Sequence, residues 1–522
     1  MIRVRQVKVH IDSNNLVKKI ASKLNIKENE KINYKIIKES IDARDKNNIY
    51  YIYEVDVEVV NEDIILKNNK SNDILKSEPI NYKIEVTGTN HLDKRPVIVG
   101  SGPAGLFSAY YLAKLGYKPL IIERGEEVEK RIKSVEDFWN NNKLNVNSNV
   151  QFGEGGAGTF SDGKLNTLVK DKFGRKDEIL KVFVENGANP SILYKNKPHI
   201  GTDILVKIVK NMRNKIINWG GEYRFNTTLT DINIENNKIK SIVVNNNETI
   251  ETDILILAIG HSARDTFKML YEKKLTMSPK PFAVGIRIMH PQEIINMNQY
   301  GTNKLGSADY KLTYKASNNR GVYSFCMCPG GYVVNASSEL NRLAINGMSY
   351  SKRDSGVANS AIIVTVSPDD YGNNPLDGIE FQRNLEEKAY NLGNGNIPVQ
   401  LYGDYKENII SNKLNFDPCI KGKYQFSNIN EIFPNYINES LKEAIENFNN
   451  KIKGFNRDDT VMAAIESRTS SPVRIERNEN FESNIKGIYP IGEGAGYAGG
   501  ITTSAIDGLK VVEIISNIYK NI

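Results

Sequence analysis

The chain has 522 residues, of which 40% are hydrophobic and 25% charged, and at about 150 residues per domain this length accommodates about three domains. That apolar content excludes a largely disordered chain. The net charge of +7 is small for the length, and no Lys/Arg block concentrates it, so we expect no nucleic-acid partner.

The cysteine count and the hydrophobic pattern favour a cytoplasmic protein. The three cysteines, Cys326, Cys328 and Cys419, are too few for a disulfide framework. Residues 1–8 carry charges where a secretory signal needs an apolar run, and no stretch reaches the ~18 apolar residues of a membrane span. We therefore expect no membrane partner. No His or Cys cluster has ligand spacing, so we also expect no metal.

Residues 1–90 are predicted to form a small α+β domain. Apolar alternation predicts a strand over 4–11 and two more near 32–41 and 49–60, and helical spacing predicts a helix over 16–24. The solvent face of the last strand carries Glu54, Asp56 and Glu58. Because an acidic face repels phosphate, a packing or docking module is favoured over an RNA-binding sheet.

A dinucleotide-binding motif begins the second region. The apolar strand 97–99 leads into a GxGxxG turn at 100–105 and a helix over 106–115. Strand 120–122 then ends in Glu123, 18 positions after the last glycine. In this motif the glycines allow a tight turn and close approach of a pyrophosphate, and the acid binds the ribose hydroxyls. The pattern predicts dinucleotide binding.

The middle of the chain alternates predicted elements. A helix over 203–219, strands near 229–234 and 239–244, and an apolar strand over 252–260 continue the first part of the nucleotide-binding domain, which we place at 91–275. We predict an inserted substrate or cap domain of mixed α/β structure at 276–460. Residues 461–522 return to the nucleotide-binding domain.

A second glycine cluster at 492–500 decides between NAD and FAD. It follows strand 487–491 and precedes only the helix 501–518, so no later strand presents a ribose-binding acid. The cluster instead fits a flavoprotein, in which an acid after the strand, here Glu493, binds the ribityl chain. The helix beginning at Ile501 then points its N-terminus at the flavin pyrimidine ring. FAD is the predicted cofactor.

Two further segments agree with FAD. The run 153–159 is too rich in glycine for a helix or strand, which suits backbone lying close to a flat cofactor, although an ordinary flexible loop remains an alternative. The strand end 258–260 is similar to the ATG element of glutathione-reductase-type flavoproteins, with Ile259 where Thr is usual.

These motifs together resemble the two-dinucleotide-binding-motif flavoproteins and, more closely, a bacterial family of FAD-dependent dehydrogenases. The matching stretches are 40–44, 151–165, 325–331, 468–474 and the glycine-rich tail. The resemblance implies an α/β and α+β protein: a Rossmann-like FAD-binding domain, an inserted mixed α/β substrate domain and an N-terminal ferredoxin-like domain. It implies an FAD-dependent oxidoreductase without naming its substrate.

Several residues are predicted to contact FAD. They follow the glycine turns, the two strand-end acids and the helix starts: Gly100, Gly102, Pro103, Ala104, Gly105, Glu123, Arg124, Arg131, Gly156, Ala157, Gly158, Lys164, Gly260, Gly492, Glu493, Gly499, Gly500 and Ile501. For Lys164 the alternatives are a contact to a phosphate or to the N5 side of the flavin, or a solvated lysine.

Four residues are candidates for the reaction: His261, Cys326, Cys328 and Arg468. His261 could move a proton near the cofactor or bond only the backbone. Cys326 and Cys328 form a CxC, unlike the CxxC of disulfide reductases, and are either a thiol site or buried small hydrophobes. Arg468 could bind a substrate carboxylate or form a salt bridge.

We expect an FAD-dependent oxidoreductase that moves a hydride or electrons through flavin N5 to or from a small molecule. NADH or NADPH is a candidate reductant, binding transiently. The alternatives are an RNA-modifying flavoprotein that uses the N-terminal domain as a reader, and a protein in which FAD is structural.

Overall fold

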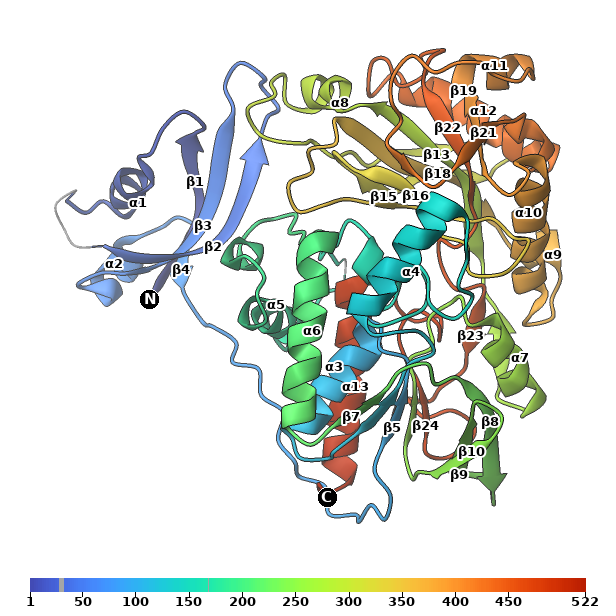
Figure 1. The fold of residues 1–522 in the computed structure, drawn as a ribbon. Coiled ribbons are helices and arrows are strands. Elements are labelled where there is room, and N and C mark those ends of the chain that lie inside the picture. Colours follow the sequence, from blue (N-terminus) through green and yellow to red (C-terminus); the bar gives the residue numbers. More distant parts are fainter. Residues whose placement is uncertain (28–31, 168) are drawn as a thin grey trace.

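The computed structural model describes residues 1–27, 32–167 and 169–522. A small N-terminal domain lies beside a large body that contains two major sheets (Figure 1). One sheet carries the predicted nucleotide-binding motif, and the other belongs to the predicted insertion.

The N-terminal domain has the βαββαβ order of a ferredoxin-like fold. Its elements are β1 (Ile2–His10), α1 (Leu16–Leu24), β2 (Asn33–Asp42), β3 (Tyr50–Glu58), α2 (Glu62–Asn68) and β4 (Ile74–Lys76). The strands form an antiparallel sheet in the order β2-β3-β1-β4. The ferredoxin-like expectation is therefore confirmed, although the sequence patterns missed α2 and β4.

A bulge in β1 explains how this domain fills its core. Val4 and Val7 are three positions apart and would face opposite sides of a regular strand, yet both are buried. Gln6 takes a positive φ of 53°, and the pairing with β3 shifts between Val4 and Val7. The extra residue turns Val7 back to the core beside Val4.

The acidic face expected on β3 is neutralised by its neighbours, which corrects the argument from charge. Asp56 is 4% exposed and accepts two hydrogen bonds from Arg3, at 2.8 and 3.0 Å, and one from Ser77 at 2.7 Å. Glu54 lies 3.4 Å from the Nε atom of Arg5. Because arginines of β1 pair with these acids, the face carries little free negative charge.

The N-terminal domain contacts the body through strand β2. The backbone N–H of Glu39 donates to the carbonyl of Tyr194 at 2.8 Å, and the N–H of Asn196 donates back to Glu39 at 2.9 Å. Lys46 also reaches the carbonyl of Met297. An edge strand that would otherwise expose its ladder is thus partly paired.

The first major sheet is parallel and Rossmann-like, in the order β24-β11-β5-β6-β7. Its strands are β5 (Val97–Val99), β6 (Leu120–Ile122), β7 (Glu222–Arg224), β11 (Leu255–Leu257) and β24 (Ile488–Pro490). The central strands are buried on both faces, as expected where a parallel sheet is covered on both sides.

Helices cover one face of this sheet, and a small sheet covers the other (Figure 1). The helices are α3 (Pro103–Lys114), α5 (Arg175–Glu185), α6 (Thr202–Asn218) and α13 (Ile501–Ile518). The opposite cover comprises β8 (Leu229–Glu235), β9 (Lys238–Val244), β10 (Glu248–Glu251) and α7 (Arg264–Glu272), while α4 (Val128–Asn141) packs beside α6. The bounds of α13 match the sequence expectation.

The second major sheet is mixed and has the order β14-β15-β18-β13-β22-β19-β21. Its strands are β13 (Phe282–Pro291), β14 (Thr313–Lys315), β15 (Gly321–Cys328), β18 (Val357–Val366), β19 (Ile397–Leu401), β21 (Tyr424–Phe426) and β22 (Val461–Glu466). The buried strand β22 pairs with β13 and β19, so this sheet extends past residue 460, where we expected the insertion to end.

Helices and a three-stranded sheet complete the inserted region. The helices are α8 (Gln292–Gln299), α9 (Pro368–Tyr371), α10 (Asp377–Leu392), α11 (Tyr402–Glu407) and α12 (Asn435–Phe448). The small sheet contains β16 (Tyr332–Asn335), β17 (Ile345–Met348) and β20 (Ile420–Lys421). A separate antiparallel pair is formed by β12 (Met277–Pro279) and β23 (Val473–Ile475).

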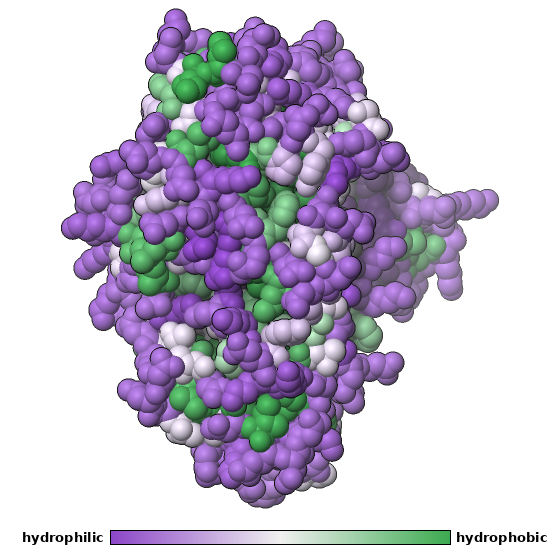
Figure 2. Space-filling model, turned by 90° about the vertical axis from the view of Figure 1, so that its right-hand side faces the viewer, coloured by the Kyte–Doolittle hydropathy of each residue, from purple (hydrophilic) through white to green (hydrophobic). Residues whose placement is uncertain are grey.

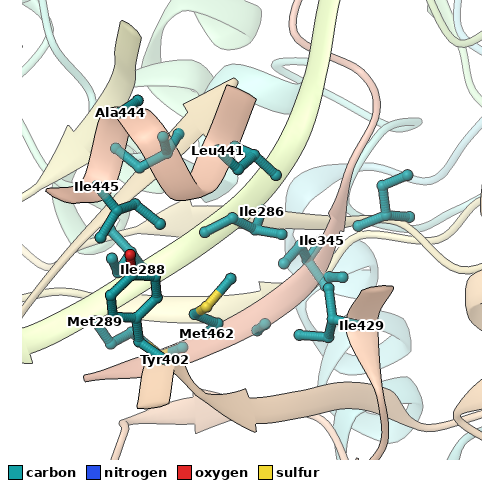
Figure 3. Close-up of a cluster of buried hydrophobic side chains, with 14 of the residues drawn as sticks. Ile286, Ile288, Met289, Ile345, Tyr402, Ile429, Leu441, Ala444, Ile445 and Met462 are labelled. Carbon is teal, nitrogen blue, oxygen red and sulfur yellow. The ribbon is translucent and has the colours of Figure 1, made fainter. Parts of the chain in front are cut away.

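The core of the inserted region lies between α12 and the mixed sheet. Leu441 and Ile445 of α12 face Ile286 and Ile288 of β13, with Met462 of β22 in the same buried cluster (Figure 3). Hydrophobic burial of this kind contributes about 25 cal/mol per Å² of apolar surface. A sheet anchored in this way can present rigid side chains at its edge.

The surface is mainly hydrophilic on the face shown in Figure 2, with scattered apolar patches. Within the described residues no helix is both long and apolar enough to cross a bilayer.

Candidate functional site

A large cavity opens where the parallel sheet meets the inserted sheet. It holds about 1540 Å³ of empty space, counted out to its open mouth. Its lining includes the segments that follow the carboxyl ends of β5, β6, β11 and β24, together with residues of β15 and β22. Ligands of open α/β sheets bind at this edge.

The glycines of the GxGxxG turn have two different structural roles. Gly100 has a φ of +96°, and a Cβ there would lie 2.4 Å from the carbonyl of Ala258. A Cβ on Gly105 would lie 2.0 Å from the Gly100 carbonyl, so both positions are fixed by packing. A Cβ on Gly102 would meet only the Cα of Gly156, at 3.8 Å, and would point into open space. Gly102 is therefore available to a ligand.

Helix α3 begins directly after Gly102 and carries no side-chain cap. Pro103 occupies its first turn, where the missing N–H costs no intrahelical bond. The remaining free N–H groups and the helix dipole favour an anion at this end. A pyrophosphate between Gly102 and the first turn satisfies both.

Glu123 ties together the two segments that form the cavity floor. Its Oε2 accepts from the backbone N–H and the hydroxyl of Ser101, at 2.9 and 2.8 Å, and its Oε1 accepts from the N–H groups of Gly125 and Gly153, both at 3.0 Å. A carboxylate has about four acceptor sites. A ribose hydroxyl must therefore share or replace the bond from Ser101, whose hydroxyl can rotate.

The glycine-rich loop packs against the first glycine turn instead of moving freely. Gly153, Gly155 and Gly156 all have positive φ angles. A Cβ on Gly156 would lie 2.9 Å from the Cα of Gly102, so the two backbones lie in contact. The flexible-loop alternative therefore does not describe this segment.

Arg131 holds this loop from behind, which corrects its expected contact with the cofactor. The side chain is fully buried and does not line the cavity. Its guanidinium donates to five backbone carbonyls, those of Asn149, Val150, Gly153, Glu154 and Gly156. Arg131 thus positions the loop and does not face the ligand space.

The C-terminal glycine cluster is held by an aspartate of α13. Asp507 accepts from the N–H of Gly492 at 2.8 Å and from Arg477 at 2.8 Å through each oxygen. Gly492, Glu493, Gly500 and Ile501 line the cavity. This arrangement aims the N-terminus of α13 at the ligand space.

Most of the predicted cofactor and catalytic residues converge on the cavity lining. These are Gly100, Gly102, Pro103, Ala104, Glu123, Arg124, Gly156, Ala157, Gly158, Lys164, Gly260, His261, Cys326, Arg468, Gly492, Glu493, Gly500 and Ile501. Four others lie outside the lining: Gly105, Arg131, Cys328 and Gly499. Gly105 is needed for helix packing, and Cys328 lies behind Cys326.

His261 is a neutral, unpartnered imidazole at the cavity. Its Nδ1 lies 3.6 Å from Oε1 of Glu493, and among the described residues neither ring nitrogen has a hydrogen-bond partner. Burial lowers the pKa of His261 to about 3, and the charges of Arg468 and Arg264 act in the same direction. Burial raises the pKa of Glu493 to about 7. Both ring nitrogens are buried, so among the described residues one N–H donor and one ring acceptor stay unsatisfied.

Arg468 is engaged in a buried ion cluster and is not a free guanidinium. It donates to both oxygens of Glu386, at 3.0 and 2.9 Å, and to the hydroxyls of Ser262 and Ser338. Arg264 binds the same carboxylate through two bonds of 2.8 Å. The salt-bridge alternative describes Arg468, although its side chain still lines the cavity.

Lys164 and the cysteines lie on the inserted side. The Lys164 ammonium donates to the carbonyl of Met327 and lies 3.7 Å from Asp162, so it is paired and not simply solvated. Cys326 lines the cavity and Cys328 is fully buried. Both are free thiols.

Sequence reasoning missed the polar residues that the inserted region adds to the lining. Asn346 and Glu466 both hydrogen-bond the buried Arg287, and Phe325 stands beside them 39% exposed. These residues come from three separate strands, and no local spacing connects them. Among the described residues no group of His, Cys, Asp and Glu is arranged to hold a metal ion.

Comparison with known proteins also indicates a nucleotide-binding domain and an FAD-dependent protein. Residues 281–469 match a family described as FAD-dependent protein, C-terminal domain-like, and residues 98–157 match the NAD(P)-binding Rossmann-like domain. Residues 1–58 match a domain of unknown function (DUF8436). An uncharacterized protein of Clostridium beijerinckii is 50% identical over 526 residues, which cover 98% of both chains.

Two solved structures are similar at a lower level. Glycine oxidase from Bacillus cereus is 11% identical, with 81% of this chain and 95% of the oxidase covered and a TM-score of 0.37. L-Proline dehydrogenase from P. horikoshii is 14% identical, with 82% and 94% covered and a TM-score of 0.36.

A parallel sheet that opens onto a glycine-lined cavity beneath an inserted sheet, with an FAD-dependent C-terminal domain, defines a flavoprotein. The chain belongs to the same family as the uncharacterized C. beijerinckii protein, and its inserted region matches the FAD-dependent protein family. FAD is its cofactor, and the cavity suits it: a Cβ at Gly102 would project into open space that a ligand can fill, and the His261 imidazole lacks a partner among the described residues.

Proposed function

We propose that this protein oxidises or reduces a small molecule by hydride transfer through flavin N5, at the end of the cavity where the inserted sheet meets the parallel sheet. One observation carries the proposal. A single cavity runs from the uncapped N-terminus of α3 to the polar side chains of His261, Glu493 and Cys326.

When bound, FAD supplies an electron-pair acceptor or donor at its ring. The chain's own residues do the rest. Gly102 leaves room for the pyrophosphate, Gly156 packs against it, and the N-terminus of α13 favours negative charge at the pyrimidine end of the cofactor.

Glu493 is the proposed proton-handling group, and His261 is its proposed hydrogen-bonding neighbour. The neutral imidazole can donate from one ring nitrogen or accept at the other. Glu493 has a pKa of about 7 and can therefore hold or release a proton near neutral pH, where general acid–base catalysis is most effective. Their separation of 3.6 Å leaves room for a tightening contact once a ligand is bound.

The inserted region is the proposed substrate cover. Phe325 and Asn346 reach the cavity from its strands, and Arg468 places a buried positive charge beside them. We propose NADH or NADPH as a transient reductant and a small molecule as the substrate. The proposed cover begins near residue 276 and includes β22, which extends the inserted sheet past the expected limit of 460.

The test is anaerobic reduction of the flavin, followed at the visible bands after mixing with NADH, NADPH or panels of small alcohols, amines and hydroxy acids. We expect bleaching with at least one of them. His261→Asn should slow it by about 100-fold, the usual effect of removing a hydrogen-bond donor aimed at charge that develops in the reaction. His10→Asn, at the end of β1 in the N-terminal domain, is the matched control and should bleach at the wild-type rate.

Flavin bands that persist with every donor and substrate would contradict the proposal and favour a structural flavin. A His261→Asn protein that bleaches as fast as wild type would leave hydride transfer standing but remove His261 from it. Binding of tRNA that weakens steeply with salt would instead favour the RNA-modifying alternative.

A further inference from the structure

The wall of the cavity contains a pair of thiols that the proposed reaction does not use. Cys326 lines the cavity, and Cys328 lies directly behind it, fully buried. We propose that Cys326 and Cys328 are a redox-active dithiol that closes to an intrachain disulfide and exchanges two electrons with the FAD bound in this cavity. The inference rests on the proposed function because it needs a redox-active flavin at this end of the cavity.

The backbone of β15 is deformed at this pair. Its pairing with β18 runs to Phe325 opposite Ala361 and resumes at Cys328 opposite Asn359, with a register shift between them. Cys326 sits in this bulge with a φ of 44°, a conformation that side-chain-bearing residues rarely adopt. Strain of this kind persists where the surrounding structure holds it and is concentrated at functional sites.

The bulge matters for disulfide geometry. In a regular strand, residues two apart have Cα atoms about 6.6 Å apart, at the upper limit for a disulfide. A bulge bends the strand and shortens this span. Only Met327 separates the two cysteines, and Cys328 Sγ lies 3.2 Å from the Cys326 carbonyl. The bulge therefore brings the two cysteines closer together than a regular strand would.

The two sulfurs have different surroundings, which assigns their roles. Cys326 is half-buried and faces the cavity, so it is the outer sulfur that reaches the flavin. Cys328 Sγ lies 3.2 Å from the Cys326 carbonyl and 3.9 Å from Nη1 of Arg287. It is the inner sulfur that resolves the bond.

Two cations flank the pair. Arg287 is fully buried and donates to the Cys326 carbonyl at 3.2 Å, while Glu466 and Asn359 fix its orientation at 2.8 and 2.7 Å. The Lys164 ammonium donates to the Met327 carbonyl, between the two cysteines.

These neighbours give the two thiols opposite protonation states. The hydrogen bond from Cys328, together with Arg287 and Lys164, lowers the pKa of Cys326 to about 5 against the effect of burial. The pKa of Cys328 is raised by the same hydrogen bond and by burial. At neutral pH the pair is therefore one thiolate and one thiol, the form that thiol–disulfide chemistry requires.

The proposed step balances in atoms and electrons. A bond forms between Cys326 Sγ, as thiolate, and Cys328 Sγ, whose S–H bond breaks. Two electrons leave the sulfurs and reduce oxidised FAD, and the Cys328 proton is taken up with them to give the anionic reduced flavin. The reverse step regenerates the dithiol from reduced flavin.

The test counts electrons and thiols in the FAD-loaded protein. Anaerobic dithionite titration of the air-oxidised protein should require four electrons per flavin in the wild type, two for FAD and two for the disulfide. Cys326→Ser and Cys328→Ser should each require two. Cys419→Ser, a half-buried cysteine that bonds the Ser355 carbonyl, is the matched control and should still require four.

Alkylation and peptide mass mapping give a readout independent of turnover. Before reduction, only Cys419 should be alkylated in the unfolded wild-type protein, and after reduction all three cysteines should be. An oxidised protein that alkylates at all three positions, or a wild type that takes two electrons per flavin, would overturn the proposal. If a cysteine variant loses FAD or fails to fold, the wild-type titration and mapping decide alone.

Failure of the dithiol and failure of the proposed function give different results. Flavin that bleaches with a nicotinamide or substrate while all three thiols stay free removes only the dithiol. A disulfide that is present but never passes electrons to or from a reducible flavin also removes the exchange. Flavin that no donor or substrate bleaches removes the proposed function itself.

Discussion

The cavity has two sides that are built in different ways. Its floor consists of Gly100, Gly102, Glu123 and Gly156 and is mostly backbone in close contact. Its wall consists of His261, Cys326, Glu466, Arg468 and Glu493, of which Glu466 and Arg468 are buried in ion pairs. The floor fits any dinucleotide, because backbone recognises phosphate. The wall carries the chemistry, because only side chains there can move protons or electrons.

The largest expected effect comes from a substitution that disrupts the ion cluster behind the wall. Replacing Glu386 by Gln leaves Arg264 and Arg468 buried without their shared carboxylate, which should cost about 3–5 kcal/mol of unfolding free energy. Urea unfolding at pH 7 measures it. Glu380→Gln on the same helix removes only the exposed pair with Arg383 and should change stability by less than about 0.5 kcal/mol.

The pH dependence of that loss follows from the carboxylate. Burial opposes ionisation of Glu386, but Arg264 and Arg468 hold its pKa well below the usual 4.5. The ionised group therefore stabilises the fold above about pH 4.5, and this contribution is lost as the pH falls below that value. Wild type and Glu386→Gln should converge in stability at acid pH. A stability difference between the two proteins that widens at acid pH would contradict the assigned pairing of Glu386 with Arg264 and Arg468.

The next largest effects distinguish a glycine that faces the ligand space from a glycine that is packed against backbone. Gly102→Leu places a side chain in open space and should weaken FAD retention by about 100-fold, or about 2.7 kcal/mol, with the fold intact. Gly105→Ala puts a Cβ 2.0 Å from a carbonyl and should lower stability by about 1–3 kcal/mol. Flavin content and thermal unfolding measure both. Wild-type flavin content in Gly102→Leu would refute the proposed cofactor position.

A smaller effect tests the cost of burying Glu493. Its pKa rises from 4.5 to about 7, so the folded state binds this proton more tightly than the unfolded state. Its contribution favours folding at low pH and is lost as the pH rises from 4.5 to 7. In the flavin-free protein, Glu493→Gln should be more stable than wild type by about 1–3 kcal/mol at pH 8. The difference should vanish by pH 4. A destabilised variant at pH 8 would show that Glu493 is paired.

The prediction with the smallest effect on the fold concerns the alkylation of Cys326. In the reduced protein its alkylation rate should follow the thiolate and reach half its maximum near pH 5, because Cys328, Arg287 and Lys164 favour the charged form. Cys419, whose pKa burial raises, should react only at higher pH. Equal pH profiles for the two cysteines would contradict the difference between their pKa values.

The floor could be predicted because its signal is local. The turn at 100–105 and Glu123 lie within one βαβ unit, and their spacing alone implies the geometry. The helix bounds of α1 and α13 also followed from periodicity and from the residues that end them. The role of Arg131 was not predictable, since nothing in its helix shows that five carbonyls of a later loop surround it.

The wall could be predicted only in part because distant segments build it. Glu386 belongs to α10, Arg264 to α7 and Arg468 follows β22, so their ion cluster exists only in the folded chain. The charge of the β3 face was misjudged for the same reason: Arg3 lies 53 positions from Asp56. Cys326 and Cys328 were noticed by spacing, but the bulge that joins them was not.

The most direct test of the account is a crystal structure of the protein loaded with oxidised FAD. We predict the pyrophosphate against the backbone of Gly102 and Gly156, and the flavin ring in contact with His261 and with Cys326 Sγ. The floor and the wall would then hold the two ends of one molecule. A flavin ring that points out of the cavity, with His261 and Cys326 on the far side from it, would contradict the account.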